Sequence, residues 1–401
     1  MRAAPTQDEV RRQNLGALLR WVHLHGATSR AELTSLLGLN RSTIGALTAD
    51  LAAARLVAED TPKGLRRAGR PSLVVRPQSA SVYAYAVSIE VDRLRAARVG
   101  LGGVVLDRRE LPRPRGVQIL ETVAPLAGFV REMHRRVPAG AIYVGGGVSV
   151  AGMVRREDGL VRLSPHIGWV DEPIGIALAA ELGGDQPMTV GNHADVAALA
   201  EHARGAAAGC DNVLYLYGDV GIGGGIIAGG RRVTGHGGYG GEVGHMVVNP
   251  HGKPCGCGSR GCWETEIGEA ALLTAAGRAG ATGRDAILAV VDAAERGDTT
   301  ARNALRQVGD WLGFGVANLV NIFNPEAVLF GGTLRDVYLA AAAHVRSRLN
   351  EMALPATREH VRLRTPALGD DATLIGAAEL AFERLLADPL DAAGSPVPPP
   401  R

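Results

Sequence analysis

Residues 245–262 read HMVVNPHGKPCGCGSRGC, and this stretch carries the most specific pattern in the chain. It contains three of the four cysteines, Cys255, Cys257 and Cys262. Clustered cysteines in a chain that shows no secretion signal favour a metal site over disulfide bonds. Three thiolates and one imidazole complete a tetrahedral site with no position open to water, so we expect a structural zinc ion. Either His245 or His251 can supply the imidazole.

The segments on both sides of this loop alternate between strands and helices. One series is predicted to have strands at 83–91, 94–101 and 104–111, a helix near 119–135 and a strand at 141–144. A second series is predicted to have strands at 213–217 and 225–233, helices through 270–294 and 301–323, a strand at 327–330 and a final helix at 372–386. Two similar series predict an α/β fold of two lobes.

We place the domain boundaries where the pattern changes. Residues 79–190 are assigned to lobe 1. Residues 191–386 are assigned to lobe 2, which includes the zinc loop and the C-terminal helix. Within lobe 2, residues 221–225 are rich in glycine and are expected to form a tight turn between two strands. The proline-rich end of the chain, residues 387–401, lacks apolar spacing and is predicted to be disordered.

Residues 1–78 show the pattern of a winged helix-turn-helix. A helix is predicted over 8–25, a second one begins at Ser29 with Glu32 completing a capping box, and a third begins after Asn40. Two short helices joined by a tight turn are typical of DNA-binding proteins. Residues 56–59 and 72–75 predict the hairpin of the wing.

Positive charge is concentrated in residues 1–78. Residues 1–78 have 12 lysines and arginines against 6 acids, although the net charge of the whole chain is only +2. An arginine on the stiff backbone of Gly69-Arg70-Pro71 suits a narrow minor groove. We expect contacts with a double-stranded DNA operator from the start of the third helix and from the wing: Asn40, Arg41, Ser42, Thr43, Arg67 and Arg70. The alternative is a solvated basic loop on a small helical domain.

The composition, with 46% hydrophobic and 21% charged residues, is ordinary for a globular protein. No apolar run reaches the roughly 18 residues that a membrane span requires. We therefore expect a cytoplasmic protein without a membrane partner.

Further residues around the zinc loop resemble a known family. Gly241-Glu242-Val243-Gly244-His245, followed by Cys-x-Cys-Gly-x-x-Gly-Cys-x-Glu, is similar to the signature of the ROK family (repressors, open reading frames and kinases). The similarity covers nearly the whole chain, and a winged helix ending in Gly-Arg-Pro resembles the repressor branch. The resemblance implies an actin-like, hexokinase-like fold with a sugar bound between the lobes.

The resemblance also implies roles for individual residues. It makes His245, rather than His251, the zinc ligand. It places Asn192, Glu242, His245 and Glu264 on sugar hydroxyls, with His193 beside them in the ligand site. His166 and Trp169 lie in a family loop that lines the cleft, although Trp169 fits a core position equally well.

Three departures from the family's kinases argue against catalysis. The first phosphate loop, Asp-x-Gly-Gly-Thr in the kinases, is replaced by residues 90–94, Glu-Val-Asp-Arg-Leu. The second loop, Gly-Thr-Gly in the kinases, reads Asp219-Val-Gly221 here. His193 takes the place of the catalytic aspartate. Since phosphoryl transfer needs a phosphate cradle and a base, we expect no enzymatic activity.

These features favour a DNA-binding transcriptional repressor whose operator affinity is modulated by a sugar or sugar derivative. Two other hypotheses remain: an ATP-dependent sugar kinase, and a ligand-independent repressor whose ROK domain is a dimerisation scaffold. A sugar-binding screen separates the first hypothesis from the last. A homodimer or homotetramer would suit a pseudo-palindromic operator.

Overall fold

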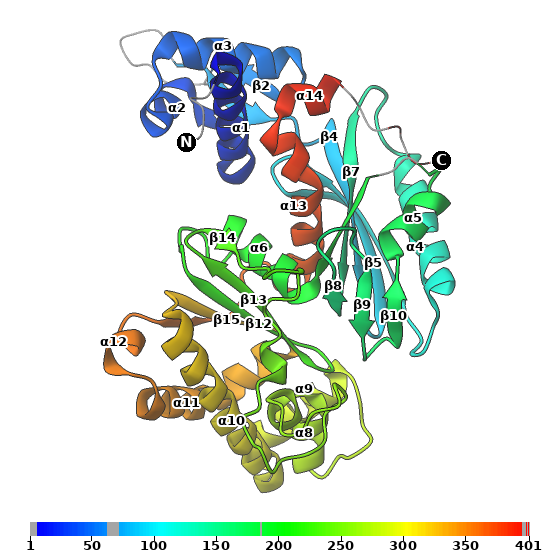
Figure 1. The fold of residues 1–401 in the computed structure, drawn as a ribbon, viewed down its shortest axis with the longest axis vertical. Coiled ribbons are helices and arrows are strands. Elements are labelled where there is room, and N and C mark those ends of the chain that lie inside the picture. Colours follow the sequence, from blue (N-terminus) through cyan, green and yellow to red (C-terminus); the bar gives the residue numbers. More distant parts are fainter. Residues whose placement is uncertain (1–5, 62–71, 185–186, 395–397, 399, 401) are drawn as a thin grey trace.

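The N-terminal part of the chain folds as three helices and a small sheet, which we call the head (Figure 1). The computed structural model describes all residues except 1–5, 62–71, 185–186, 395–397, 399 and 401. The head contains α1 (Gln7–His25), α2 (Arg30–Leu37), α3 (Arg41–Ala53), β1 (Thr28–Ser29), β2 (Val57–Asp60) and β3 (Val74–Pro77). Strand β3 pairs antiparallel with both β1 and β2. The three helices, β2 and β3 follow one another in the predicted order, whereas β1 was not predicted. Arg67 and Arg70 of the predicted wing lie outside the described residues.

Local sequence signals set the ends of the head helices. Ser29 Oγ accepts from the Glu32 amide at 3.2 Å, and the Glu32 carboxylate accepts from the Ser29 amide at 2.9 Å. This is the predicted capping box. Helix α2 is capped by Gly38, whose φ of +63° favours glycine. Asn40 Oδ1 accepts from the Thr43 amide at 2.8 Å and begins α3.

Lobe 1 is built on a five-stranded sheet in the order β11-β7-β4-β5-β6. Strands β4, β5 and β6 form an antiparallel meander, and β7 and β11 add parallel strands. A second, small sheet contains β8, β9 and β10. The bounds are β4 (Val82–Ile89), β5 (Arg93–Gly100), β6 (Val104–Pro112), α4 (Ile119–His134), β7 (Ile142–Val150), β8 (Met153–Val154), β9 (Val161–Ser164), β10 (Trp169–Glu172), α5 (Ile174–Glu181) and β11 (Met188–Asn192).

Lobe 2 repeats this topology with a sheet in the order β16-β15-β12-β13-β14. The meander β12-β13-β14 is again extended by two parallel strands. The repetition confirms the predicted two-lobed α/β fold. The bounds are α6 (His193–Arg204), β12 (Val213–Gly218), β13 (Ile222–Ala228), β14 (Arg231–Arg232), α7 (Glu264–Ile267), α8 (Glu269–Ala275), α9 (Arg284–Glu295), α10 (Thr299–Phe323), β15 (Ala327–Gly332), α11 (Thr333–Met352), α12 (Pro355–Arg358) and β16 (Arg362–Arg364).

The C-terminal helix belongs to a different lobe from the one predicted. Helix α13 (Ala372–Ala387) packs on β4, β7 and β11 of lobe 1 and, on another side, against α6. Figure 1 shows it beside β4 and β7. It is apolar on most of its circumference, so it can bury one side on the sheet of lobe 1 and another side on α1 and α6. The chain therefore returns to lobe 1 after completing lobe 2.

Two smaller expectations were also wrong. The first part of the predicted disordered tail forms α14 (Pro389–Gly394), and Leu390 packs against the core shared by the head and lobe 1. Glycines 223–225 lie within β13 and not in a turn. A Cβ on Gly225 would come within 2.3 Å of the Ala194 carbonyl oxygen, so glycine allows α6 to pack closely on that strand.

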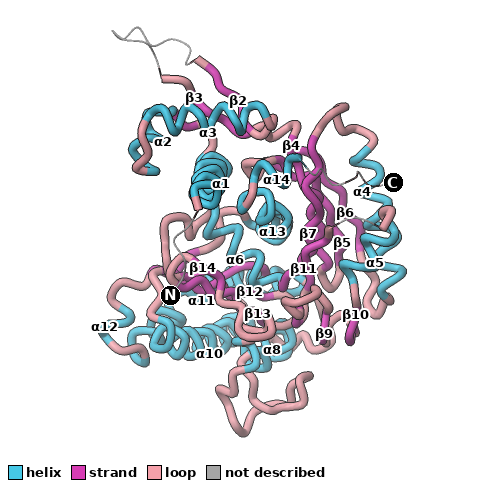
Figure 2. Tube along the Cα trace, turned by 45° about the horizontal axis from the view of Figure 1, so that its top comes forward, coloured by secondary structure: helices cyan, strands magenta, loops and turns pink. Residues whose placement is uncertain are grey.

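The head and lobe 1 share one hydrophobic core. Leu18 and Val22 of α1 pack in the same cluster as Leu374 and Phe382 of α13, and α1 lies alongside α13 and α14 (Figure 2). A Cβ on Gly16 would approach the Leu386 carbonyl oxygen to 2.7 Å, which shows how closely the helices approach. The head is therefore fixed to lobe 1 by packing. In the described part of the chain, no helix combines the length and apolarity needed to cross a membrane.

Candidate functional site

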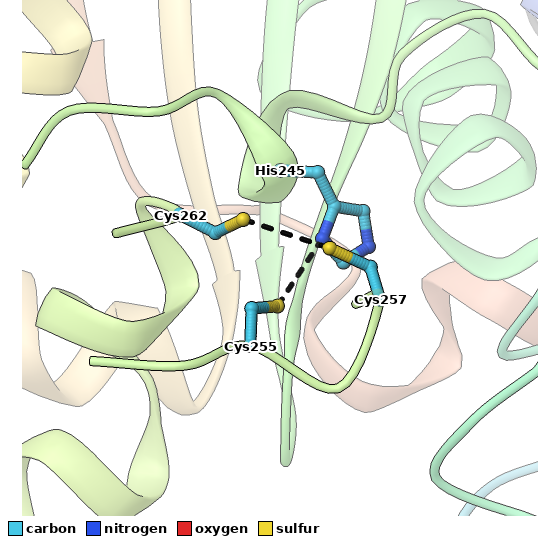
Figure 3. A group of neighbouring side chains, drawn as sticks. All are labelled: His245, Cys255, Cys257 and Cys262. Carbon is cyan, nitrogen blue, oxygen red and sulfur yellow. Dashed lines mark hydrogen bonds between the residues drawn. The ribbon is translucent and has the colours of Figure 1, made fainter. Parts of the chain in front are cut away.

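The four residues of the predicted metal motif converge in the structure. His245, Cys255, Cys257 and Cys262 each place one potential ligand atom within 4.8 Å of the others. His245 Nδ1 lies 3.7 Å from Cys255 Sγ, and the Cys257 and Cys262 sulfurs are also 3.7 Å apart (Figure 3). Ligands bound tetrahedrally to zinc at their usual distances stand about 3.4–3.8 Å from one another. The cluster therefore has the dimensions of a four-ligand metal site.

The backbone of the loop brings the sulfurs together. Two isolated β-bridges, Val247 with Cys262 and Pro254 with Arg260, fold the loop back on itself. Gly261 adopts a φ of +66°, and a Cβ there would lie 1.6 Å from the Asn249 carbonyl oxygen, so the turn requires glycine. Burial raises the pKa of the Cys255 and Cys262 thiols. A cation is therefore needed to stabilise thiolates at these positions.

The geometry offers His245, and not His251, as the fourth ligand. His251 is exposed and lies outside the cluster in the described part of the chain. His245 ends the short 3₁₀ helix η1 (Val243–His245). Its Nδ1 atom faces the sulfurs, while its Nε2 atom lies 4.0 Å from Glu242 Oε2. One imidazole can therefore serve the metal through Nδ1 and a neighbouring ligand through Nε2.

A cavity of about 140 Å³ opens beside the metal cluster, between the two lobes. Its lining includes the five residues that the resemblance placed on or beside the sugar: Asn192, His193, Glu242, His245 and Glu264. His166 also lines the cavity. These residues come from the end of β11, the start of α6, η1 and α7. Trp169 is instead buried in the core of lobe 1. Residues from distant parts of the chain therefore meet at one cavity.

Asn192 has a structural task at this cavity as well. Its Oδ1 atom caps α6 by accepting from the amides of Ala194 at 2.8 Å and Asp195 at 3.3 Å. Its Nδ2 atom donates to the Gly152 carbonyl at 2.8 Å. The amide fixes the start of α6 to the loop after β7, and it keeps one Nδ2 hydrogen for a ligand.

His193 is a buried, neutral residue. Burial lowers its pKa to about 3, and the charge of Arg95 adds to the effect. Ser149 Oγ lies 2.6 Å from His193 Nδ1, while the Nε2 atom has no hydrogen-bond partner among the described residues. Ser149 was not among the predicted site residues. Its position as a polar residue in the otherwise apolar stretch Gly-Gly-Gly-Val-Ser-Val could have indicated a buried hydrogen-bonding role.

Carboxylates and imidazoles face each other across the cavity. Glu264 accepts from Cys255 Sγ at 3.0 Å and lies 4.0 Å from His166 Nε2. Burial raises the pKa of Glu242, and nearby Glu264 contributes while His245 opposes the rise. Burial also lowers the pKa of His166. Groups of this kind can accept from and donate to adjacent hydroxyls of a polyol.

A second cavity, of about 330 Å³, is acidic and includes residues from the two segments that were predicted to replace the kinases' phosphate loops. Glu90, Asp92, Asp219 and Asp370 line it. Burial raises the pKa of Asp219 to about 7, with further contributions from Glu90, Asp92 and Glu269. Arg93 and Arg284 also lie there, but their guanidinium groups pair with Glu90, Asp336 and Asp370. The surplus of carboxylates is unfavourable for a polyphosphate.

The predicted recognition helix presents its first turn to solvent. Asn40, Arg41 and Ser42 are exposed and Thr43 is half-buried. Ser42 Oγ donates to Asn40 Oδ1 at 2.7 Å, so these two side chains stabilise the cap. Among the described residues, Arg41 has no hydrogen-bond or ion-pair partner and is free to reach a ligand.

Comparisons with known proteins identify relatives along nearly the whole chain. Xylose repressor from Bacillus spizizenii is 26% identical over 382 residues, which cover 95% of this chain and 97% of that protein. A crystal structure of a ROK family transcriptional regulator, a homologue of the E. coli MLC protein, matches with a TM-score of 0.80 and 25% identity. It covers 97% of this chain and 100% of that one.

A glucokinase from Streptomyces coelicolor is also similar. It is 32% identical over 315 residues, which cover 74% of this chain and 96% of the kinase. The repressor match must include most of residues 1–78, because it covers 95% of the chain. Residues 84–384 match the ROK family itself. With this match, the repeated two-lobed topology and the Gly-Glu-Val-Gly-His and cysteine motifs in place, the chain belongs to the ROK family.

Proposed function

We propose that this ROK protein is a sugar-responsive transcriptional repressor that binds operator DNA through its head. One observation carries the proposal: a helix-turn-helix with an exposed recognition helix is fused to the ROK domain through a shared core. The similarity to repressors, which extends through the head, supports the same function. The bound sugar occupies the cavity beside the metal cluster and modulates the affinity for DNA.

Within this proposal, the metal is a structural zinc ion held by His245, Cys255, Cys257 and Cys262. When bound, zinc supplies a fixed positive charge and sets the orientation of the loop. The ligand side chains Glu242 and Glu264 lie next to that loop, together with His245 Nε2. The residues of the loop therefore orient hydrogen-bonding groups toward the cavity and do not perform chemistry on the ligand.

The proposal is tested by two binding experiments, one with DNA and one with sugars. Operator DNA is selected from a random pool by the full-length protein. D-xylose, D-glucose and N-acetylglucosamine are then titrated into the protein in a calorimeter. Binding of a defined DNA sequence and of at least one sugar is expected. If DNA binds but no sugar does, the ligand-independent repressor is the better function.

We expect no phosphoryl transfer from ATP to a hexose or pentose. At neutral pH, a histidine with a pKa of about 3 does not accept a proton effectively from a sugar hydroxyl. The acidic second cavity also disfavours ATP. Coupled-enzyme assays with ATP, magnesium and each sugar should remain at background. A turnover in the usual range of about 1–10³ per second would show that the protein is a kinase.

Arg41→Ala is expected to weaken operator binding by about 1–3 kcal/mol if Arg41 contacts a base. The reason is that Arg41 is exposed at the start of α3 and has no partner in the described structure. Fluorescence anisotropy at fixed salt measures the effect. Arg306→Ala, which removes an exposed charge from α10 in lobe 2, is the matched control. Equal affinities of both variants and the wild type would place the reading surface elsewhere.

The proposed repressor acts as a homodimer or homotetramer. Two-fold symmetry places two recognition helices on half-sites about 34–36 Å apart. Sedimentation of the full-length protein, with and without selected DNA, determines the number of copies.

A further inference from the structure

A buried polar network joins the head to both lobes. It consists of His23 on α1, Arg204 at the end of α6 and Glu379 on α13. Their side chains are 0%, 13% and 6% exposed, respectively. These helices belong to the head, lobe 2 and lobe 1, respectively. We call this group of three residues the clamp.

Arg204, which belongs to lobe 2, contacts both the head and lobe 1. Its guanidinium pairs with Glu379 Oε1 through both Nε and Nη2. Its Nη1 atom donates to the carbonyl oxygens of Gly102 at 2.9 Å and His23 at 3.3 Å. One side chain from lobe 2 therefore binds a carboxylate of lobe 1 and the backbone of the head. A planar guanidinium with five donors suits this task better than an ammonium group.

The hydrogen bonds of His23 fix its tautomer. The Gly102 amide donates to His23 Nδ1 at 2.9 Å, so the ring proton lies on Nε2. Glu379 Oε2 and Arg204 Nη2 both lie 2.9 Å from Nε2, and of these two only the carboxylate can accept the proton. Burial alone would raise the pKa of Glu379, but His23 and Arg204 lower it to about 2. Glu379 is therefore an ionised buried group that depends on both partners.

The turn at residues 102–103 is shaped to receive the arginine. Gly102 and Gly103 have φ values of +97° and +76°. A Cβ on Gly103 would lie 2.5 Å from the Arg204 guanidinium carbon. In the sequence, these two glycines separate the predicted strands 94–101 and 104–111. The structure shows that they also make room for a residue of the other lobe.

Helix α6 connects the clamp to the ligand cavity. Asn192 caps its start and His193 is its first residue, and both line the cavity, while Arg204 is its last residue. A helix of 12 residues is about 18 Å long and transmits a displacement of one end to the other. It packs on α13 of lobe 1 and on β12 and β13 of lobe 2, so it lies where the lobes meet.

We propose that Arg204, Glu379 and His23 are positioning residues that set the orientation of the head on both lobes, and that α6 carries a ligand-induced movement of lobe 2 to α1 through them. The second half of this statement rests on the proposed sugar sensing. The first half, the fixing of the head, does not depend on a ligand.

The fixing role is tested by hydrogen–deuterium exchange in the unliganded, full-length protein. Because the Gly102 amide bonds to His23, its exchange rate reports directly on the clamp. Glu379→Gln keeps the size of the side chain and removes its charge, and Arg204→Gln replaces the guanidinium with a shorter, neutral polar side chain. Each is expected to speed exchange at Gly102 and in the last turn of α1 by at least about tenfold. The control is Arg232→Gln, which breaks pairs with Asp195 on α6 and Glu383 on α13 but does not touch the head.

The transmitting role is tested by adding D-xylose or D-glucose to the same proteins. In the wild type, a sugar that protects the cavity residues should also change exchange in the last turn of α1. In Arg204→Gln, the cavity should remain protected while the change in α1 disappears. If neither sugar protects the wild-type cavity, the proposed sensing of these sugars fails. The exchange rates of the unliganded proteins then test only whether the clamp fixes the head.

Two results in the variants, and one in the control, would overturn the proposal. One is exchange at Gly102 and in α1 that is unchanged in both Arg204→Gln and Glu379→Gln. The other is a sugar-induced change in α1 that survives intact in Arg204→Gln. A similar rise in the Arg232→Gln control would also count against it, because contact between the lobes in general would then be responsible.

Discussion

Cys257→Ser is expected to abolish metal binding and to lower the free energy of unfolding by several kcal/mol. Coordination in small structural zinc sites is worth about 10 kcal/mol or more, and part of that free energy stabilises the folded loop. Cys257 is exposed, so a serine at this position costs little in packing. The loss of stability therefore reports on the ion itself. Elemental analysis and thermal unfolding of wild type and variant measure the two effects.

The matched control for this variant is His251→Ala. His251 lies in the same loop and is the other histidine that the sequence allows as a ligand, but it is exposed and outside the cluster. The control should retain one zinc ion per chain and the stability of the wild type. If His251→Ala loses the metal and His245→Ala keeps it, the ligand set is wrong. If the wild-type protein contains no metal after gentle purification, the proposal of a zinc site is wrong.

The second large effect is expected for Glu242→Ala, which should weaken sugar binding by about 10–100-fold. Hydrogen bonds to charged groups contribute about 1.5–3 kcal/mol each, and Glu242 faces the cavity beside His245 Nε2. Operator affinity in the absence of sugar should remain close to that of the wild type, since Glu242 does not belong to the head. Calorimetry with a sugar that binds the wild type measures the first quantity, and anisotropy the second.

Glu383→Gln is the corresponding control. Glu383 lies on α13 at a neighbouring cavity and pairs with Arg232, but it does not line the cavity beside the metal cluster. Its sugar affinity should match that of the wild type. Equal sugar affinity in Glu242→Ala and the wild type would mean that the ligand binds elsewhere.

Short-range patterns were enough to predict much of this fold. Capping depends on residues three positions apart, so Ser29 with Glu32, and Asn40 with Thr43, could be read directly from the sequence. Strand meanders and the cysteine spacing are also local. The repetition of one series of elements then predicted the two lobes, because each series must bury its own sheet.

Features that depend on distant contacts were not predictable in the same way. An apolar helix such as α13 can cover either sheet, and only the path of the whole chain places it on lobe 1. Leu390 is apolar, but its partial burial depends on contacts of α14 with α1, α3 and β7, which are far away in the sequence. His23 and Glu379 are separated by 356 positions, and a single histidine in a helix gives no sign of a buried partner. In the ligand site, motif resemblance named the residues, but only the structure showed that Asn192 also caps α6.

The central claim is that a sugar in the inter-lobe cavity changes the affinity of the head for DNA. The most direct measurement is the operator affinity of the full-length protein, by fluorescence anisotropy, with and without a sugar that calorimetry shows to bind. We expect the sugar to weaken operator binding by about 5–150-fold, equivalent to a coupling of about 1–3 kcal/mol, and DNA to weaken sugar binding by the same factor. A sugar that binds tightly while the operator affinity stays unchanged would contradict the account.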